Sequence, residues 1–139
     1  MTATRSIVSV LAILALVAIA TAPALAANPE EFAEAQARAD KYLSDMSPGI
    51  MKYRYGSLLS KVIEIAPAVA ECRAIAKPPA GFSFTAILSF RDGRFDRVLN
   101  DSDAPFAQCV TEALGKIDWP SPPVLDFAHE LSFSTPESQ

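Results

Sequence analysis

Two cysteines, Cys72 and Cys109, are the residues of this chain with the clearest chemistry. A pair of thiols forms a disulfide, contributes to a metal site, or stays reduced in the core. A zinc site needs further cysteine or histidine ligands at close spacing, whereas this chain has one histidine and no Cys-x-x-Cys motif. An even number of cysteines in an exported chain predicts a disulfide. We therefore predict a Cys72–Cys109 disulfide, with free buried thiols or metal ligands as the weaker alternative.

The single histidine, His129, lies between two apolar residues at alternate positions, Phe127 and Leu131. This spacing places all three side chains on one side of a strand, where a lone histidine usually has a packing role. The serines have no histidine within a recognisable nucleophile signature, and the five glycines of the chain form no phosphate-binding loop. We therefore predict no catalytic residues, and we expect that the protein is not an enzyme.

Four acidic residues cluster around a predicted hairpin: Asp92, Asp96, Asp101 and Asp103. A calcium-binding loop needs oxygen ligands at alternate positions and a closing glutamate, and this stretch lacks that pattern. Aspartate also stabilises turns and helix starts, because its carboxylate accepts hydrogen bonds from nearby backbone N–H groups. We therefore assign capping and turn roles to these residues and predict neither a metal site nor a cofactor.

The first 26 residues have the arrangement typical of a secretory signal peptide. Arg5 precedes an apolar run at residues 7–20, Pro23 then breaks the apolar helix, and Ala24 and Ala26 supply small residues at the cleavage positions. The alternative is an uncleaved membrane anchor, but the run is shorter than the ~20 residues that a bilayer requires. We predict cleavage after Ala26 and a location in the periplasm or outside the cell, which also favours the disulfide.

The charge balance limits the kind of partner. The chain has 12 Lys and Arg residues against 16 Asp and Glu, which gives a net charge of −4 at pH 7. An acidic chain is poorly suited to bind nucleic acid or an anionic membrane surface. The hydrophobic content of 50% indicates a folded core. We therefore expect a protein partner, no nucleic acid, and no membrane once the signal peptide is removed.

Residues 27–80 have the pattern of a helical segment. Asn28 is a capping residue, Pro29 suits a first helical turn, and residues 47–49 end this first helix. Its charged face, which includes Arg38, is expected in solvent, and its apolar stripe comprises Phe32, Ala35, Ala39, Tyr42, Leu43 and Met46. A second helix is expected from about residue 57, with an apolar stripe of Leu58, Leu59, Val62, Ile63 and Ala66. Pro67 should kink or restart it, and residues 68–76 continue the helix with Cys72 on one face.

Residues 81–139 change to the alternation of β-strands. Residues 82–91 form a strand with one buried face, Asp92 and Gly93 form a hairpin turn, and residues 95–100 return as a second strand. A helix over residues 103–117 and a last strand over residues 124–134 follow. This order predicts an α+β fold in which a three-stranded antiparallel sheet packs against helices and follows the N-terminal helices in one compact domain. The expected core includes Phe84, Leu88, Phe106, Val110, Leu114, Phe127 and Leu131.

Several segments of residues 82–134 together resemble a known family. They are the hairpin around Asp92 and Gly93, the helix with Phe106-Ala107-Gln108-Cys109-Val110, the segment Trp119-Pro120-Ser121-Pro122-Pro123, and the final strand. This set is similar to the C-terminal domain of the TonB/TolA proteins, in particular to the TolA-type variant with a cysteine in the helix. The resemblance implies a TonB/TolA-like sheet, a match of Cys72 to the second cysteine of that variant, and a role in binding envelope proteins.

The resemblance and the export signal together predict an exported periplasmic protein-binding module that engages an envelope protein. One alternative is a membrane-anchored TonB/TolA-like subunit with an energy-transduction or accessory role, and another is a small secreted enzyme or inhibitor. An exposed strand edge accepts a partner strand through backbone hydrogen bonds. We expect the binding edge on the last strand, with the site residues Val124, Asp126, Ala128, Glu130 and Ser132. The alternative is that Asp126 and Glu130 only protect this edge against aggregation.

Overall fold

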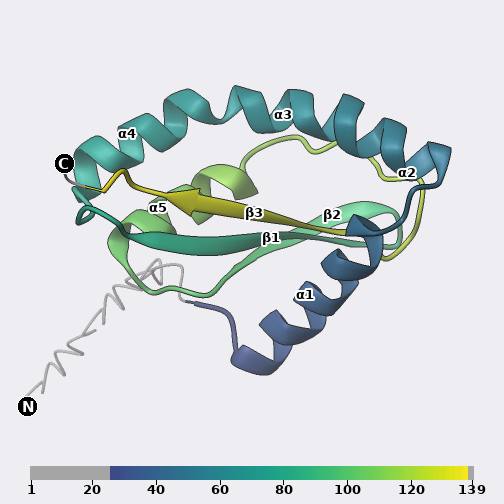
Figure 1. Ribbon diagram of the computed structural model, residues 1–139, viewed down its shortest axis with the longest axis horizontal. Helices are drawn as coiled ribbons and strands as arrows, with labels where there is room; N and C mark the ends of the chain where they lie inside the picture. The colour runs from purple at the N-terminus through teal and green to yellow at the C-terminus, as the bar shows by residue number, and fades with distance from the viewer. Residues whose placement is uncertain (1–25, 138–139) are drawn as a thin grey trace, which may run out of the picture.

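The computed structural model describes residues 26–137 as an α+β fold, as predicted (Figure 1). The signal peptide predicted over residues 1–26 lies, apart from Ala26, outside the described residues. The elements are α1 (Pro29–Leu43), α2 (Pro48–Lys52), the π-helix η1 (Tyr53–Leu58), α3 (Leu59–Glu64), α4 (Ala66–Ala76), β1 (Ser83–Arg91), β2 (Arg94–Asn100), α5 (Pro105–Gly115) and β3 (Ala128–Ser134). The strands form one antiparallel sheet in the order β2-β1-β3.

The helices begin and end for local reasons that the sequence contains. The side chain of Asn28 accepts a hydrogen bond of 2.9 Å from the Glu30 backbone N–H and caps α1. The second helical run begins at Pro48 instead of residue 57, because proline at a first turn starts a helix without losing a hydrogen bond. It passes through η1 and α3, restarts as α4 beside Pro67, and ends where Lys77 takes a left-handed conformation. Figure 1 shows this run as a long rod above the sheet.

The sheet is built around β1, which pairs with both other strands. Asp92 and Gly93 have φ angles of 54° and 74°, so they form the predicted tight turn between β1 and β2. Strand β3 pairs antiparallel with β1, from Ser83 opposite Ser134 to Ser89 opposite Ala128. The last strand therefore lies at an edge of the sheet.

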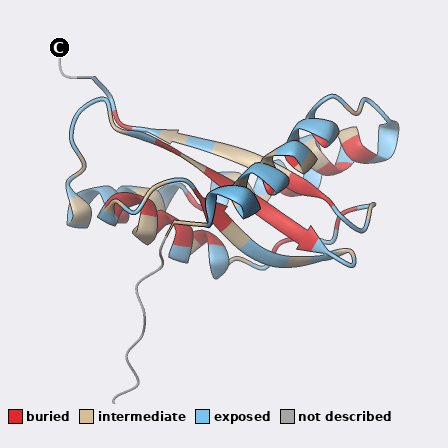
Figure 2. Cartoon of the chain, turned by 90° about the horizontal axis from the view of Figure 1, so that it is seen from below, coloured by how far each residue is buried: buried red, intermediate tan, exposed pale blue. Residues whose placement is uncertain are grey.

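Both faces of the sheet are covered, so the prediction of a single buried face was wrong. One face of β1 packs with η1, α4 and α5 in the main core, and the other presents Ile87 to α1. Helix α1 supplies Ala35 and Ala39, whose small side chains allow close packing against Ile87 and Ala128. Figure 1 shows α1 and the α2–α4 rod on opposite sides of the sheet, and Figure 2 shows the buried residues along the strands and the inner helix faces.

The predicted core is confirmed at six of its seven positions, and Leu131 is only partly buried because β3 is an edge strand. The predicted helix stripes were wrong at five positions, which are exposed: Leu43, Met46, Leu59, Ile63 and Ala66. Met46 follows the end of α1, and Leu43 is its last residue. In the second run, Leu58 is buried as predicted, but η1 inserts a wider turn that rotates the buried stripe, so Ile65 faces the core instead of Leu59 and Ile63.

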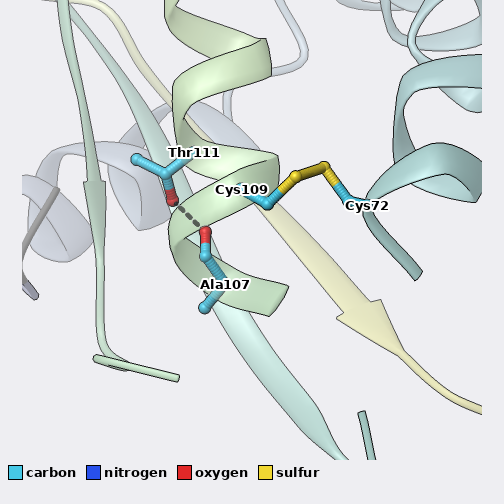
Figure 3. Close-up of a disulfide and its surroundings, with 4 residues drawn as sticks. All are labelled: Cys72, Ala107, Cys109 and Thr111. Atoms are coloured by element: carbon cyan, nitrogen blue, oxygen red, sulfur yellow. Dashed lines mark hydrogen bonds between the residues drawn. A yellow bond between two sulfur atoms is a disulfide. The ribbon is translucent and has the colours of Figure 1, made fainter. Parts of the chain in front are cut away.

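The predicted disulfide is confirmed between α4 and α5. The Cα atoms of Cys72 and Cys109 are 5.6 Å apart and the two sulfur atoms are bonded (Figure 3). On the next turn of α5, the Thr111 hydroxyl donates a hydrogen bond of 2.7 Å to the Ala107 carbonyl (Figure 3). The same hydroxyl accepts a hydrogen bond of 2.7 Å from the Asn100 side-chain amide. The disulfide thus fixes α5 to α4, while the polar contact fixes α5 to β2.

Candidate functional site

The outer edge of β3 presents backbone groups that the sheet does not use. At the two ends of the β1–β3 pair, the Phe90 N–H donates to the Phe127 carbonyl over 2.9 Å, and the Thr135 N–H donates to the Phe82 carbonyl over 2.8 Å. In an antiparallel pair, residues whose backbone N–H and C=O groups bond to the neighbouring strand alternate with residues whose groups point away from it. The residues at every second position between Phe127 and Thr135 therefore also direct these groups to β1. The N–H and C=O groups directed away from the sheet belong to Ala128, Glu130, Ser132 and Ser134. Within residues 26–137, no hydrogen bond occupies these outward groups.

Three of the five predicted binding residues lie on this edge. The side chain of Ala128 is buried against α1, Glu130 is half-buried, and Ser132 is exposed. The prediction that the strand also includes Val124 and Asp126 was wrong, because β3 begins at Ala128. The preceding segment bonds to the hairpin turn instead, where the Gly93 N–H donates to the Leu125 carbonyl over 3.0 Å.

Asp126 fixes the start of β3 to α1. Its carboxylate accepts a short hydrogen bond from the Tyr42 hydroxyl, which holds the pKa of Asp126 below its ordinary value. Burial, reinforced by Asp126, raises the pKa of Tyr42. Arg38 donates to the Asp126 backbone carbonyl over 3.3 Å and to the Ser89 hydroxyl over 2.8 Å, so it is not the solvated residue that its position in the sequence predicted. These bonds give Asp126 a structural role rather than a place on the edge.

A pocket lies on the side of β3 that faces the second helical run. It has a volume of about 210 Å³, and we call it the α3 pocket. Its lining is mainly apolar and comprises Arg54, Tyr55, Leu59, Val62, His129 and Leu131. Tyr55 and Leu59 are 60% and 44% exposed, so apolar surface is available beside the free edge. No motif in the sequence predicted this role, since Leu59 was expected in the core.

A second pocket lies on the side of β3 that faces α1. It has a volume of about 160 Å³, we call it the α1 pocket, and its lining residues are Ala39, Asp40, Leu43, His129 and Glu130. The Gln36 side-chain amide donates to the Glu130 carboxylate over 3.4 Å. Among the described residues, no Lys or Arg forms an ion pair with Asp40 or Glu130. The α1 pocket is therefore acidic, whereas the α3 pocket is apolar.

His129 lies between the two pockets and has the properties of a packing residue. Its ring stacks on Phe127 with the ring centres 6.4 Å apart. Burial, together with the positive charge of Arg54, lowers the pKa of His129 to about 4, so the imidazole is neutral at pH 7. A neutral, stacked histidine between apolar and acidic surfaces shapes the two pockets without adding positive charge.

No match was found when the chain was compared with protein-family models, with curated proteins and with solved structures. The TonB/TolA resemblance of residues 82–134 therefore stays a prediction. Over residues 26–137, no helix has the length and apolar character needed to cross a bilayer. In the same range, no three His, Cys, Asp or Glu side chains gather in a way that could hold a metal ion.

Proposed function

We propose that this protein is an exported, non-enzymatic module of the periplasm that binds an extended segment of an envelope protein. The segment adds to the sheet as a fourth strand beside β3, in the way that the resemblance to the TonB/TolA C-terminal domain implies. The observation that carries the proposal is the row of outward N–H and C=O groups at Ala128, Glu130, Ser132 and Ser134. Such a row provides backbone hydrogen bonds for a partner strand, and adjacent pockets provide side-chain selectivity.

The side chains around the edge also support strand addition. Natural edge strands avoid unwanted pairing through charges, proline, bulges or a covering segment. Glu130 is the single charged residue within β3, and its carboxylate is engaged by Gln36. Asp126, the second charge that could protect the edge, lies before the strand and bonds to Tyr42. The protection of this edge is therefore weak.

The disulfide supports the exported location in the proposal. Cys72 and Cys109 are bonded, and disulfides persist in oxidising compartments such as the periplasm. A disulfide also fits secretion beyond the cell. The periplasmic part of the proposal therefore rests on the predicted signal peptide and on the proposed envelope partner. Fractionation followed by N-terminal sequencing tests this part of the proposal, and we expect a mature chain that starts at Ala27.

Proline substitution on the free edge tests the binding mode. Glu130→Pro and Ser132→Pro each remove one outward N–H without removing a β1–β3 hydrogen bond. We expect each variant to lose capture of an envelope protein from a periplasmic extract. Its Tm should change by no more than about 5 °C, the shift that ~1 kcal/mol produces in a domain of this size.

Two controls separate the backbone from the side chains. Ser132→Ala keeps the outward N–H of Ser132 and should keep capture of the same protein, identified by mass spectrometry. Val98→Pro removes an outward N–H from β2, the other edge of the sheet, and should also keep capture. If the Glu130→Pro and Ser132→Pro variants fold and still capture the partner, the partner docks elsewhere and the proposal is wrong.

A further inference from the structure

The pairing geometry of β3 determines where the side chains of an added strand would lie. Residues paired across a sheet point to the same face, and successive residues point to opposite faces. A residue opposite Glu130 would therefore lie on the α1 face, beside the α1 pocket. Its two neighbours in the added strand would lie opposite His129 and Leu131, at the α3 pocket.

The α3 pocket favours an uncharged apolar side chain. Leu59, Val62 and Leu131 present aliphatic surface there, and filling the pocket would remove that surface from water. Arg54 is the charged residue of its lining, and its guanidinium donates to the Leu43 carbonyl over 3.1 Å and lies 5.3 Å from the Tyr55 ring centre. A Lys or Arg entering this pocket would meet a like charge.

The α1 pocket favours a basic side chain. Asp40 and Glu130 contribute two carboxylates without an ion-pair partner among the described residues. The nearest basic residue along the helix, Lys41, is directed to Tyr42, with its amine 4.9 Å from the centre of that ring. His129, which lines both pockets, adds no positive charge at pH 7. An opposite charge directly across two strands stabilises their pairing, and a like charge weakens it.

From this arrangement we infer that the edge selects an extended peptide in which apolar and basic residues alternate. A Lys or Arg pairs with Glu130 and Asp40 on the α1 face, and aliphatic residues on either side of it fill the α3 pocket. This inference rests on the proposed function, because it assigns the sequence preference of the same β3 edge.

Three synthetic peptides of the length of β3 test the inference by amide NMR titration of the isotope-labelled protein. The first alternates Val and Lys, the second alternates Val and Glu, and the third is the Val/Lys peptide with N-methyl groups on alternate amides. We expect the Val/Lys peptide to shift the amide signals of Ala128, Glu130 and Ser132. It should bind about three- to tenfold more tightly than the Val/Glu peptide, while the N-methylated peptide should fail to bind.

Charge-neutralising variants test the role of the two acids. The double substitution Asp40→Asn with Glu130→Gln should remove the preference for Val/Lys, so that the two peptides bind within about twofold of each other. Glu71→Gln with Glu112→Gln makes the same change of charge beside the disulfide, and this control should keep the preference.

The outcomes separate the inference from the proposed function. If the Val/Lys and Val/Glu peptides shift the same edge amides with equal affinity, the inference is overturned while strand addition stands. If neither peptide binds, or if the N-methylated peptide binds as well as its parent, strand addition fails and the inference fails with it. Concentration-dependent shifts of these amides without peptide would mean that a second copy of the chain occupies the edge, and that would also overturn the inference.

Discussion

Removal of the disulfide should destabilise the fold mainly by giving freedom to the unfolded chain. Cys72 and Cys109 close a loop with a sequence separation of 37 residues. The loop-closure entropy for that length corresponds to about 4 kcal/mol at 25 °C. In the folded state, α5 keeps the Thr111–Asn100 hydrogen bond and the buried contacts of Phe106, so it remains attached to the sheet without the cross-link. We therefore expect Cys72→Ala with Cys109→Ala to fold, with its free energy of unfolding lowered by about 4 kcal/mol.

Urea denaturation followed by circular dichroism measures this change. The reduced native chain is the matched control, because it lacks the cross-link and keeps both sulfur atoms. We expect the reduced chain and the double variant to unfold within about 1 kcal/mol of each other, since the two thiols themselves contribute little. A loss below ~1 kcal/mol relative to the oxidised protein would refute the loop-entropy reasoning. A large difference between the reduced chain and the double variant would assign the effect to packing instead.

Three further changes have defined consequences. Leu114→Ala empties a fully buried position of α5 and should lower the free energy of unfolding by about 2–5 kcal/mol in urea denaturation, whereas a loss below ~1 kcal/mol would mean that this helix face is not in the core. Tyr42→Phe removes the hydroxyl that donates to Asp126 and should cost about 1 kcal/mol, while Tyr55→Phe, at an exposed ring, should leave the stability unchanged. Because the pKa of His129 is about 4 when folded and about 6.5 when unfolded, the unfolded chain takes up the proton first as the pH falls. The native protein should therefore lose up to about 3 kcal/mol of stability between pH 7 and pH 4, and His129→Gln should flatten that part of the profile.

The sequence predicted the elements whose signals are local. Alternation over residues 82–91, followed by Asp92 and Gly93, predicted the β1–β2 hairpin, because a tight turn needs two residues that accept positive φ. The cap at Asn28 predicted the start of α1, since the capping bond lies within three residues. The Cys72–Cys109 disulfide was predicted from the count of cysteines and the export signal, although it joins separate helices.

The features that the sequence did not reveal depend on tertiary contacts. Residues 51–55 show no clear period because α2 gives way to a π-helix at Tyr53, and the wider turn of that π-helix shifted the stripe expected at Leu59 and Ile63. Arg38 lies on the charged face of α1, which predicted a solvated side chain. Its guanidinium instead donates hydrogen bonds to the Ser89 hydroxyl and to the backbone carbonyl of Asp126. The α3 pocket combines side chains of the consecutive elements η1 and α3 with side chains of β3, which is far from them in the sequence. A local sequence motif therefore could not predict the pocket.

The two edges of the sheet differ in a way that favours β3 over β2 for the proposed strand addition. Along β2, the carbonyl of Asn100 already accepts a hydrogen bond of 3.0 Å from the Ala27 N–H, so the segment before α1 covers one end of that edge. Charges dominate the remainder, where Asp96 lies 3.7 Å from Arg91 and Arg97 lies 3.3 Å from Glu31. A partner strand on β2 would have to displace the Ala27 bond and disturb these ion pairs, whereas β3 offers free backbone groups between two preformed pockets. Figure 1 shows β3 between α1 and the α2–α4 rod, so an added strand would gain contacts with helices on both faces. Helices α1 and α5 both reach β2, so the two edges differ mainly in the covered carbonyl of Asn100 and in the ion pairs along β2, which is why we assign the binding edge to β3.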